Sequence, residues 1–196
     1  MISSLNNVKV KFVRRLQTDR RFRNQENRYV VEGTRWLTEL VTLAHPPEML
    51  FCTERWLETA VHAQILQQLT NKGQFAPQLV TEEVMRAMSD TNTPSGILAV
   101  LPIRPLPLPQ PPSLLLVLDE IGTPGNLGTM LRTASAAGVD GVLLGPGNVD
   151  LYNPKVTRGS MGAHLRLPVE TLTWPEIAQM VSDLQVWVAT VQAPKA

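Results

Sequence analysis

Unbroken apolar runs and helical apolar–polar patterns alternate along the chain, and this alternation predicts strands and helices in turn. The clearest stretch begins with an apolar run over residues 114–118, typical of a central strand buried on both faces of a parallel sheet. A helical pattern follows to about residue 137, Gly138 closes it, and residues 139–144 have the pattern of the next strand. This is a βαβ unit. Because open parallel sheets bind ligands at the carboxyl ends of their strands, we expect the chemistry in the polar loop that follows residue 118.

The first hundred residues predict a smaller unit built in the same way. Helical patterns cover residues 5–16, 34–44, 56–69 and 82–88. Strand patterns cover residues 29–32, 49–52, 78–80 and 96–101. Residues 19–28 are polar and rich in arginine, and we expect a loop or a helix end there. The order of elements predicts a small α/β domain over residues 1–101.

A proline-rich segment separates this domain from the βαβ unit. Residues 102–112 contain six prolines, a density that excludes a helix and favours extended polyproline II. We expect a semi-rigid linker here and a second domain over residues 113–196. In that domain the remaining patterns predict a helix entry at Asn153, a strand over residues 165–169, a helix over 175–184 and a strand over 185–191.

Composition narrows the class of protein without naming a function. At 196 residues, 43% of them hydrophobic and 18% charged, the chain fits one large or two small globular domains. Its single cysteine, Cys52, excludes an internal disulfide and a four-cysteine zinc site, and we expect it buried on a strand. The three histidines are scattered without metal-ligand spacing, so we expect no metal. No apolar run approaches the ~18 residues of a membrane span, and the amino terminus lacks a signal-peptide core. These features favour a cytoplasmic protein with no membrane partner.

Charge is unevenly distributed, although the net charge is only +1. Residues 1–35 hold nine of the 18 lysines and arginines and three acids, which is a candidate phosphate-binding surface. The alternative is an ordinary solvated helix face. The candidate phosphate-contacting residues of this region are Arg14, Arg15, Arg20, Arg21, Arg23 and Arg28. Phe22, which lies between two of these arginines, could stack on a base, but we expect it in the core.

The loop and helix after residue 118 carry the candidate catalytic residues. Asn126 stands where an N-cap is expected, and Gly128 allows a backbone or ligand to approach closely. Arg132 lies six residues after Asn126, so its guanidinium can reach the loop region and bind a phosphate there. Asparagine caps and structural arginines are common, so this pattern alone is weak. A dinucleotide-binding fingerprint fails on glycine spacing, and no Gly-Lys-Ser/Thr phosphate loop occurs.

At these residues the chain resembles a known family. Residues 119–138, with Pro124, Asn126, Gly128 and Arg132, resemble the first signature motif of the SpoU/TrmH family of RNA 2′-O-ribose methyltransferases, part of the SPOUT superfamily. Residues 153–169, NPKVTRGSMGAHLRLPV, resemble the segment that follows it, and residues 1–101 resemble the substrate-binding domain that often precedes the catalytic one.

The resemblance implies a parallel-sheet SPOUT (α/β knot) domain that transfers a methyl group from S-adenosylmethionine to a ribose 2′-hydroxyl of ribosomal or transfer RNA. Asn126 and Arg132 would be the catalytic residues, with Lys155, Arg158 and Ser160 as further RNA contacts. A guanidinium is too weak an acid to serve as a base at neutral pH. Arg132 is therefore expected to hold phosphate and to stabilise the developing alkoxide. The resemblance also implies a homodimer.

Two later motifs of the family are expected after residues 185–191: a Gly-x-Glu loop and a Ser-Leu-Asn segment that belong to the knotted, donor-binding region. The sequence ends at Ala196, before either motif. We therefore expect the cofactor-binding residues to lie beyond Ala196 and the methyltransferase domain to lack its carboxyl-terminal part. The alternative is a non-catalytic remnant that binds RNA or dimerises.

Overall fold

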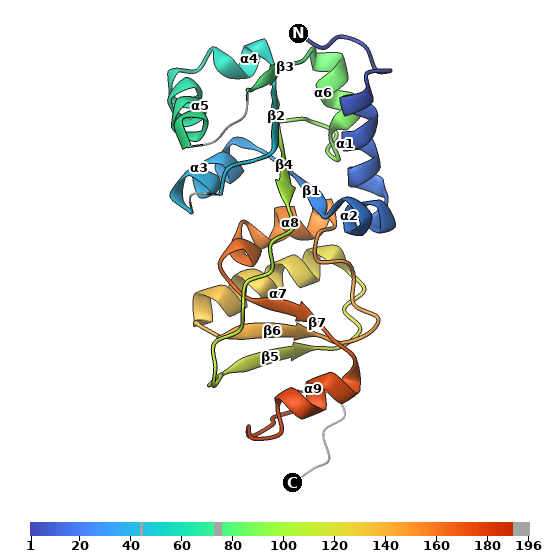
Figure 1. Cartoon of the computed structure of the whole chain (residues 1–196), viewed down its shortest axis with the longest axis vertical. Coiled ribbons are helices and arrows are strands. Elements are labelled where there is room, and N and C mark those ends of the chain that lie inside the picture. The colour runs from blue at the N-terminus through green and yellow to red at the C-terminus, as the bar shows by residue number, and fades with distance from the viewer. Residues whose placement is uncertain (44, 73–75, 190–196) are drawn as a thin grey trace.

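The computed structural model describes residues 1–43, 45–72 and 76–189, and it contains two β-sheets joined by the proline-rich segment (Figure 1). The first sheet has the order β1-β4-β2-β3 and the second the order β5-β6-β7. We refer to the parts built on these sheets as the amino-terminal unit (residues 1–102) and the carboxyl-terminal unit (residues 113–189).

The sheet of the amino-terminal unit is mixed. Its strands are β1 (Arg28–Glu32), β2 (Met49–Cys52), β3 (Gln78–Leu79) and β4 (Ile97–Pro102). Strand β4 pairs antiparallel with β1 and β2, while β2 and β3 are parallel. Cys52 is fully buried on β2, as predicted, and burial raises the pKa of its thiol to about 11.

Helices cover both faces of this sheet because its strands are apolar on both sides. Val30, Leu98 and Val100 face α1 (Val8–Thr18) and α6 (Glu82–Met88) in one core. Alternate residues such as Tyr29 and Val31 face α3 (Thr34–Thr42) and α5 (Ala60–Lys72) in a second core. Figure 1 shows the two helical layers on opposite sides of the strands, with α4 (Glu54–Leu57) beside α5.

Most of residues 19–28 form a helix, so the prediction of a loop or helix end there is wrong. Helix α2 (Arg20–Glu26) begins after Asp19, whose side chain accepts a hydrogen bond from the Phe22 N–H at 3.0 Å. It ends at Asn27 in the left-handed conformation, with φ 53°. Phe22 is buried in the core, as expected. A helix with so few apolar residues shows no periodicity, and its capping residues carry the signal instead.

Two other helices of this unit differ in their bounds from the predictions. Asn7 caps α1, so that helix begins at Val8 rather than at residue 5. The pattern over residues 56–69 corresponds to two helices, α4 and α5, and Thr53 caps the first of them. Ala44, expected on an inner face, lies outside the described residues.

The sheet of the carboxyl-terminal unit is parallel and follows the predicted βαβ order. It contains β5 (Leu115–Leu118), β6 (Gly141–Leu144) and β7 (Val169–Thr171). Helix α7 (Pro124–Ala137) covers one face together with α8 (Pro154–Ser160). Leu108 of the linker and Ile177 of α9 (Trp174–Met180) cover the other face by packing on Leu143. The mixed α/β architecture with a parallel sheet agrees with the predicted fold class.

Strand β5 is not the central strand that its apolar sequence predicts. Among the described residues it pairs only with β6, and the side chains of Leu114 and Val117 are 52% and 36% exposed. Strand β6 is the one buried along its whole length. An apolar run therefore identified the strand but not its position in the sheet.

The last part of the chain differs most from the predictions. The strand expected at residues 165–169 is replaced by a 3-10 turn, η1 (Ala163–Leu165), and by the later β7. Helix α9 ends at Met180, four residues earlier than predicted. Residues 185–189 form no strand, because they lie beside no partner strand in the described part of the chain, and residues 190–191 lie outside it.

A chain of buried hydrogen bonds joins the two units. His164 lies 2.9 Å by its Nδ1 from Ser160 Oγ and 3.2 Å by its Nε2 from Tyr29 Oη on β1. The Ser160 hydroxyl donates its only proton to the carbonyl of Thr157 at 2.8 Å, so we assign the His164 proton to Nδ1 and let Tyr29 donate to Nε2. Burial lowers the pKa of His164 to about 4, and the ring is neutral.

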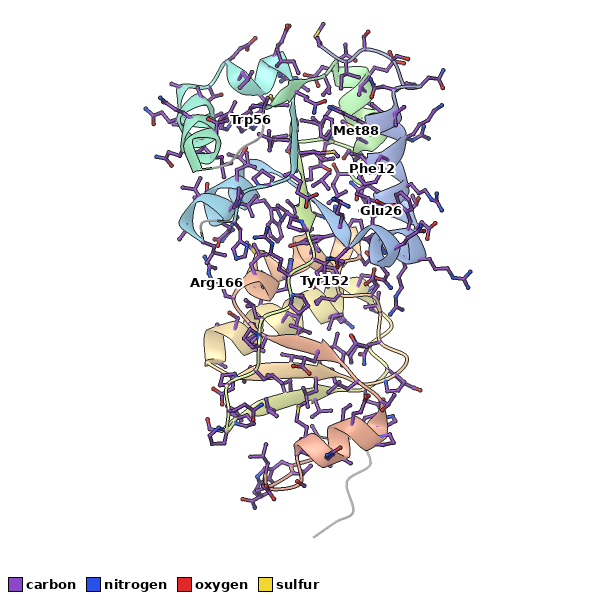
Figure 2. All side chains as sticks on the ribbon, viewed as in Figure 1. Phe12, Glu26, Trp56, Met88, Tyr152 and Arg166 are labelled. Atoms are coloured by element: carbon purple, nitrogen blue, oxygen red, sulfur yellow. The ribbon has the colours of Figure 1, made fainter. Side chains whose placement is uncertain are left out.

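Ion pairs hold the units together on either side of these buried hydrogen bonds. Arg23 donates to one Asp150 oxygen from Nε at 3.0 Å and from Nη2 at 2.6 Å, and both side chains are almost buried. On the other side, Arg166 pairs with Glu39 of α3. Figure 2 shows Tyr152 and Arg166 at the junction of the units. The two sheets are thus fixed to each other by directed polar contacts as well as by packing.

Candidate active site

The first turns of α7 hold the candidate catalytic residues at the carboxyl end of β5. Helix α7 begins at Pro124, with Thr123 as its N-cap, so Asn126 is the third helical residue and not the cap that we predicted. Proline at the first helical position explains the earlier start, because it has no N–H to satisfy and its φ suits a helix. The Asn126 side chain is exposed, and within the described residues it makes no hydrogen bond.

Asn148 fixes the loops around this helix start, and the sequence analysis missed it. Its Nδ2 donates to the carbonyls of Leu118 and Gly145, both at 2.8 Å, and its Oδ1 accepts from the Ile121 N–H at 2.9 Å. One side chain thereby ties the loop after β5 to the loop after β6. The position of an asparagine in a Gly-Pro-Gly-Asn turn after the second strand was the available signal.

Gly128 brings two backbones together, as its sequence position predicted. A Cβ at this residue would lie 2.8 Å from both the Cα and the carbonyl carbon of Gly159 and from the carbonyl oxygen of Val156. Helix α8 therefore packs directly on the backbone of α7. This contact sets the position of every residue that α8 carries.

Arg132 presents an exposed guanidinium two turns into α7. Its Nη1 donates to the Sδ of Met161 at 3.1 Å, and among the described residues it has no acidic partner. Met161 follows α8 in the left-handed conformation, with φ 52°. The guanidinium therefore points to the segment after α8 and keeps most of its donors for an anion.

The residues predicted on α8 have different environments. Lys155 is exposed, whereas Arg158 is held 3.3 Å from Asp90 of the amino-terminal unit. Ser160 is fully buried, and its hydroxyl bonds Thr157 and His164. The fold encloses Ser160 and occupies its hydrogen bonds, so the predicted contact of Ser160 with RNA stays a prediction that this structure does not support.

The arginine cluster of the amino-terminal unit also divides by burial. Arg23 is buried against Asp150 and joins the two units there, so its predicted contact with RNA stays a prediction that this structure does not support. Arg28 pairs with Glu26 and Glu48, and Arg15 pairs with Asp19. The predicted residues that are exposed without an ion pair in the described chain are Arg14, Arg20 and Arg21.

A basic groove of about 440 Å³ runs between α1 and α6. Lys11, Arg14 and Arg15 line one side, and Ser89 and Asp90 line the other. Asp90 is the residue that holds Arg158 of α8. The groove therefore meets the carboxyl-terminal unit at the Arg158–Asp90 pair, and its cations suit the phosphate backbone of a nucleic acid.

The loops at the carboxyl edge of the parallel sheet are tied together through Asn148. The backbone groups of Leu118, Ile121 and Gly145 that face one another there are already bonded to Asn148. We assign no donor-binding residue among those described. In the same part of the chain no cluster of His, Cys, Asp or Glu has the geometry of a metal site. Nor does any helix described here have the length and apolarity that crossing a membrane requires.

Comparison with known families assigns both units. Residues 113–196 match the SpoU rRNA Methylase family, and residues 7–99 match the MRM3-like substrate binding domain. The carboxyl-terminal part of the chain belongs to the SpoU rRNA Methylase family. The chain is 37% identical over 173 residues to the mitochondrial rRNA methyltransferase 3A of Danio rerio. This alignment covers 82% of the present chain and 38% of the relative.

Another similar protein is the 23S rRNA (guanosine(2553)-2'-O)-methyltransferase RlmP of Bacillus subtilis, 34% identical over 86% of this SpoU chain and 63% of the relative. The chain thus spans less than two thirds of either relative. Among solved structures, an rRNA methyltransferase from Sinorhizobium meliloti aligns with a TM-score of 0.80 at 23% identity, over 92% of this chain and 68% of that one. An RNA 2'-O ribose methyltransferase aligns with a TM-score of 0.74 at 29% identity, over 93% and 69%.

The matches divide the candidate residues between the two parts of the SpoU chain. Asn126, Arg132, Lys155 and Arg158 lie in the methylase part. The substrate-binding part contains the basic groove and α2. The buried contacts at His164 and Arg23 join the two parts, so the candidate active site and the candidate RNA surface belong to one continuous body.

Proposed function

We propose that the protein transfers a methyl group from S-adenosylmethionine to a ribose 2′-hydroxyl of RNA, with ribosomal RNA as the substrate that its relatives' names favour. The observation that carries the proposal is the pair of exposed polar side chains on α7. Asn126 lies in the first turn of α7 and Arg132 two turns into it, neither has an acidic partner among the described residues, and both lie in the part that matches the methylase family.

Arg132 and Asn126 are the residues we propose at the reacting ribose. The Arg132 guanidinium binds the phosphate next to the target nucleotide and stabilises negative charge on the 2′-oxygen, whose proton passes to solvent water as the oxygen takes the methyl group. It stays protonated throughout, because an arginine pKa lies above ~12. The Asn126 amide orients the hydroxyl by a hydrogen bond. S-adenosylmethionine supplies the methyl group; none of the described residues is assigned to hold it.

The RNA approaches over the exposed cations. On the carboxyl-terminal unit these are Lys155 and, once released from Asp90, Arg158. On the amino-terminal unit they are Arg14, Arg20 and Arg21, and Arg15 and Arg28 are cations already paired with acids. We further propose that the active form is a homodimer in the cytoplasm, which sedimentation and localisation of the whole protein would test.

The test is methyl transfer by the whole protein to ribosomal RNA, measured with S-adenosylmethionine labelled on its methyl group. We expect Arg132→Ala to lower kcat by about 10²–10³, the loss typical of one preorganised charge-stabilising donor. Arg132→Lys keeps the charge but not the planar guanidinium, so its kcat should lie between those of the native protein and of Arg132→Ala. The control is Arg55→Ala, an exposed arginine of α4 that has no ion pair within the described chain. Equal activity of the Arg132→Ala and Arg55→Ala proteins would remove Arg132 from the site.

The alternative is a protein that binds RNA without methylating it. It predicts RNA binding with no label transfer to any RNA tested, and binding of RNA that is equal with and without S-adenosylmethionine. The assay above separates the two functions directly.

A further inference from the structure

A half-open cleft of about 500 Å³ lies between the two units and is used by none of the residues assigned above to catalysis. Arg20 and Asn24 of α2 line it from the amino-terminal unit. Leu144, Val149 and Leu172 line it from the carboxyl-terminal unit. Figure 1 shows α2 above the loops that leave the strands at this edge of the sheet. Domain boundaries and the carboxyl edges of parallel sheets are the usual places for ligand sites, and this cleft is at both.

The two walls of the cleft are held at a fixed spacing. At one point the buried Arg23–Asp150 pair joins α2 to the loop that precedes Leu151, with an N–O distance of 2.6 Å. The Asn27 side chain, at the end of α2, donates to the carbonyl of Ile103 at 3.2 Å and so fixes a linker residue that also lines the cleft. A recess whose two walls are bonded to each other through the Arg23–Asp150 pair is preformed, which lowers the cost of binding.

The polar groups in the cleft fit a nucleotide. Arg20 and Asn24 are four residues apart on α2, which places them on one helix face. Within the described chain neither side chain has a bonding partner, so Arg20 offers an unpaired cation and Asn24 an unpaired amide. Most of the other lining residues are apolar, and Glu170 is an acidic residue among them. A phosphate suits the guanidinium, an unstacked base suits the apolar wall, and base amino groups suit the carboxylate.

We infer that this cleft holds one unstacked nucleotide of the RNA substrate, with its phosphate on Arg20 and its base against Val149 and Leu172. The inference rests on the proposed function for the identity of the substrate. It adds a recognition site outside the reacting ribose, built by both units together. Sequence-specific proteins commonly bind RNA through bases that are splayed out of single-stranded loops. The fixed contact between the units would then serve to keep this recognition site intact.

The test uses the four 5′-mononucleotides and the corresponding nucleosides as probes, with binding followed by NMR of methyl-labelled whole protein. We expect millimolar mononucleotides to shift the methyl signals of Val149 and Leu172. Removing the phosphate should weaken binding about tenfold in the native protein, a size typical of a charge-assisted contact. The same removal should have no effect in Arg20→Ala, because the partner of the phosphate is gone. Arg21→Ala is the control, since Arg21 is exposed on α2 but does not line the cleft.

Several outcomes would overturn the inference. One is a loss of affinity on removing the phosphate that is equal in the Arg20→Ala and Arg21→Ala proteins. Another is a response of the methyl signals to S-adenosylhomocysteine and not to nucleotides, which would make the cleft a binding site for the methyl donor. Methyl transfer separates this failure from that of the proposed function. An active enzyme whose KM for RNA is unaffected by Arg20→Ala refutes the cleft alone. Nucleotide binding in the cleft of a protein that methylates no RNA refutes the methyltransferase proposal alone.

Discussion

The contact between α7 and α8 allows a quantitative prediction, because the same helix contains two glycines in opposite environments. Gly128→Ala would place a Cβ 2.8 Å from three backbone atoms, 0.6 Å short of the 3.4 Å at which ordinary contact begins. Backbone atoms of a neighbouring helix cannot rotate away as a side chain can. The α8 backbone must therefore shift by at least this distance. At Gly125, three residues earlier, a Cβ would meet nothing within 4 Å.

The free energies of the two substitutions should have opposite signs. Overpacking of this kind costs about 1–3 kcal/mol. Replacing glycine by alanine inside a helix returns up to about 1 kcal/mol of helix propensity, less near its amino-terminal end. We expect Gly125→Ala to be neutral or slightly stabilising and Gly128→Ala to be less stable than Gly125→Ala by about 1–3 kcal/mol. The shift of α8 should also displace Met161, and with it the sulfur that Arg132 contacts.

Urea unfolding of both variants and the native protein, followed by circular dichroism, measures this difference. The slopes with denaturant should agree, since none of the substitutions changes the area exposed on unfolding by much. A Gly128→Ala protein as stable as Gly125→Ala, with the same slope, would refute the close backbone contact. It would also remove the argument that α8 is positioned by it.

Three further predictions concern the junction of the units and the basic groove. The pKa of His164 is lowered from 6.5 to about 4, so the unfolded chain takes up a proton that the folded protein excludes. The free energy of unfolding should therefore fall as the pH drops from about 6.5 toward 4, by about 2 kcal/mol between pH 7 and pH 5. This pH dependence should be absent in His164→Gln. Arg23→Ala leaves the Asp150 carboxylate buried without its partner and should destabilise by about 3–5 kcal/mol in urea, whereas Arg21→Ala should cost less than ~1 kcal/mol. Asp90→Asn frees Arg158 and should raise the affinity for RNA about twofold to fivefold at low salt, measured by fluorescence anisotropy. The increase should vanish when Arg158 is also replaced by alanine. Asp183→Asn, which removes an exposed acid elsewhere, is the control.

The sequence was sufficient for the elements that have periodic apolar patterns or clear caps. The βαβ unit from β5 to β6 and the helix α6 were found because apolar residues recur at their own periods. It was insufficient where pairing decides the outcome. Residues 185–189 have a strand-like composition but form no strand, and β5 has the sequence of a central strand but pairs on only one side. A strand is defined by its partner, which a local pattern does not contain.

The candidate site was predictable in its residue types and less so in their roles. Asn126 and Arg132 are exposed on α7, as their spacing suggested, although Asn126 is not the cap. Charge alone did not distinguish Arg23 from Arg20, which are three residues apart on α2. One is buried because Asp150, more than a hundred residues later in the chain, approaches it, and the other faces the cleft. Long-range partners of this kind are set by tertiary packing.

The placement of Arg132 depends on the amino-terminal unit through contacts that can be followed atom by atom. Tyr29 of β1 bonds His164, His164 bonds Ser160, and the next residue after Ser160 supplies the sulfur that Arg132 contacts. Turning one unit against the other would leave these buried groups without partners, and each unsatisfied group costs about 1–3 kcal/mol. It would also separate Arg23 from Asp150 and open the cleft beside α2. A substrate-binding part tied by a flexible linker could only raise the local concentration of RNA. A part locked by buried bonds fixes the proposed RNA surface relative to Arg132, so under the proposed function it can determine which ribose reaches the guanidinium.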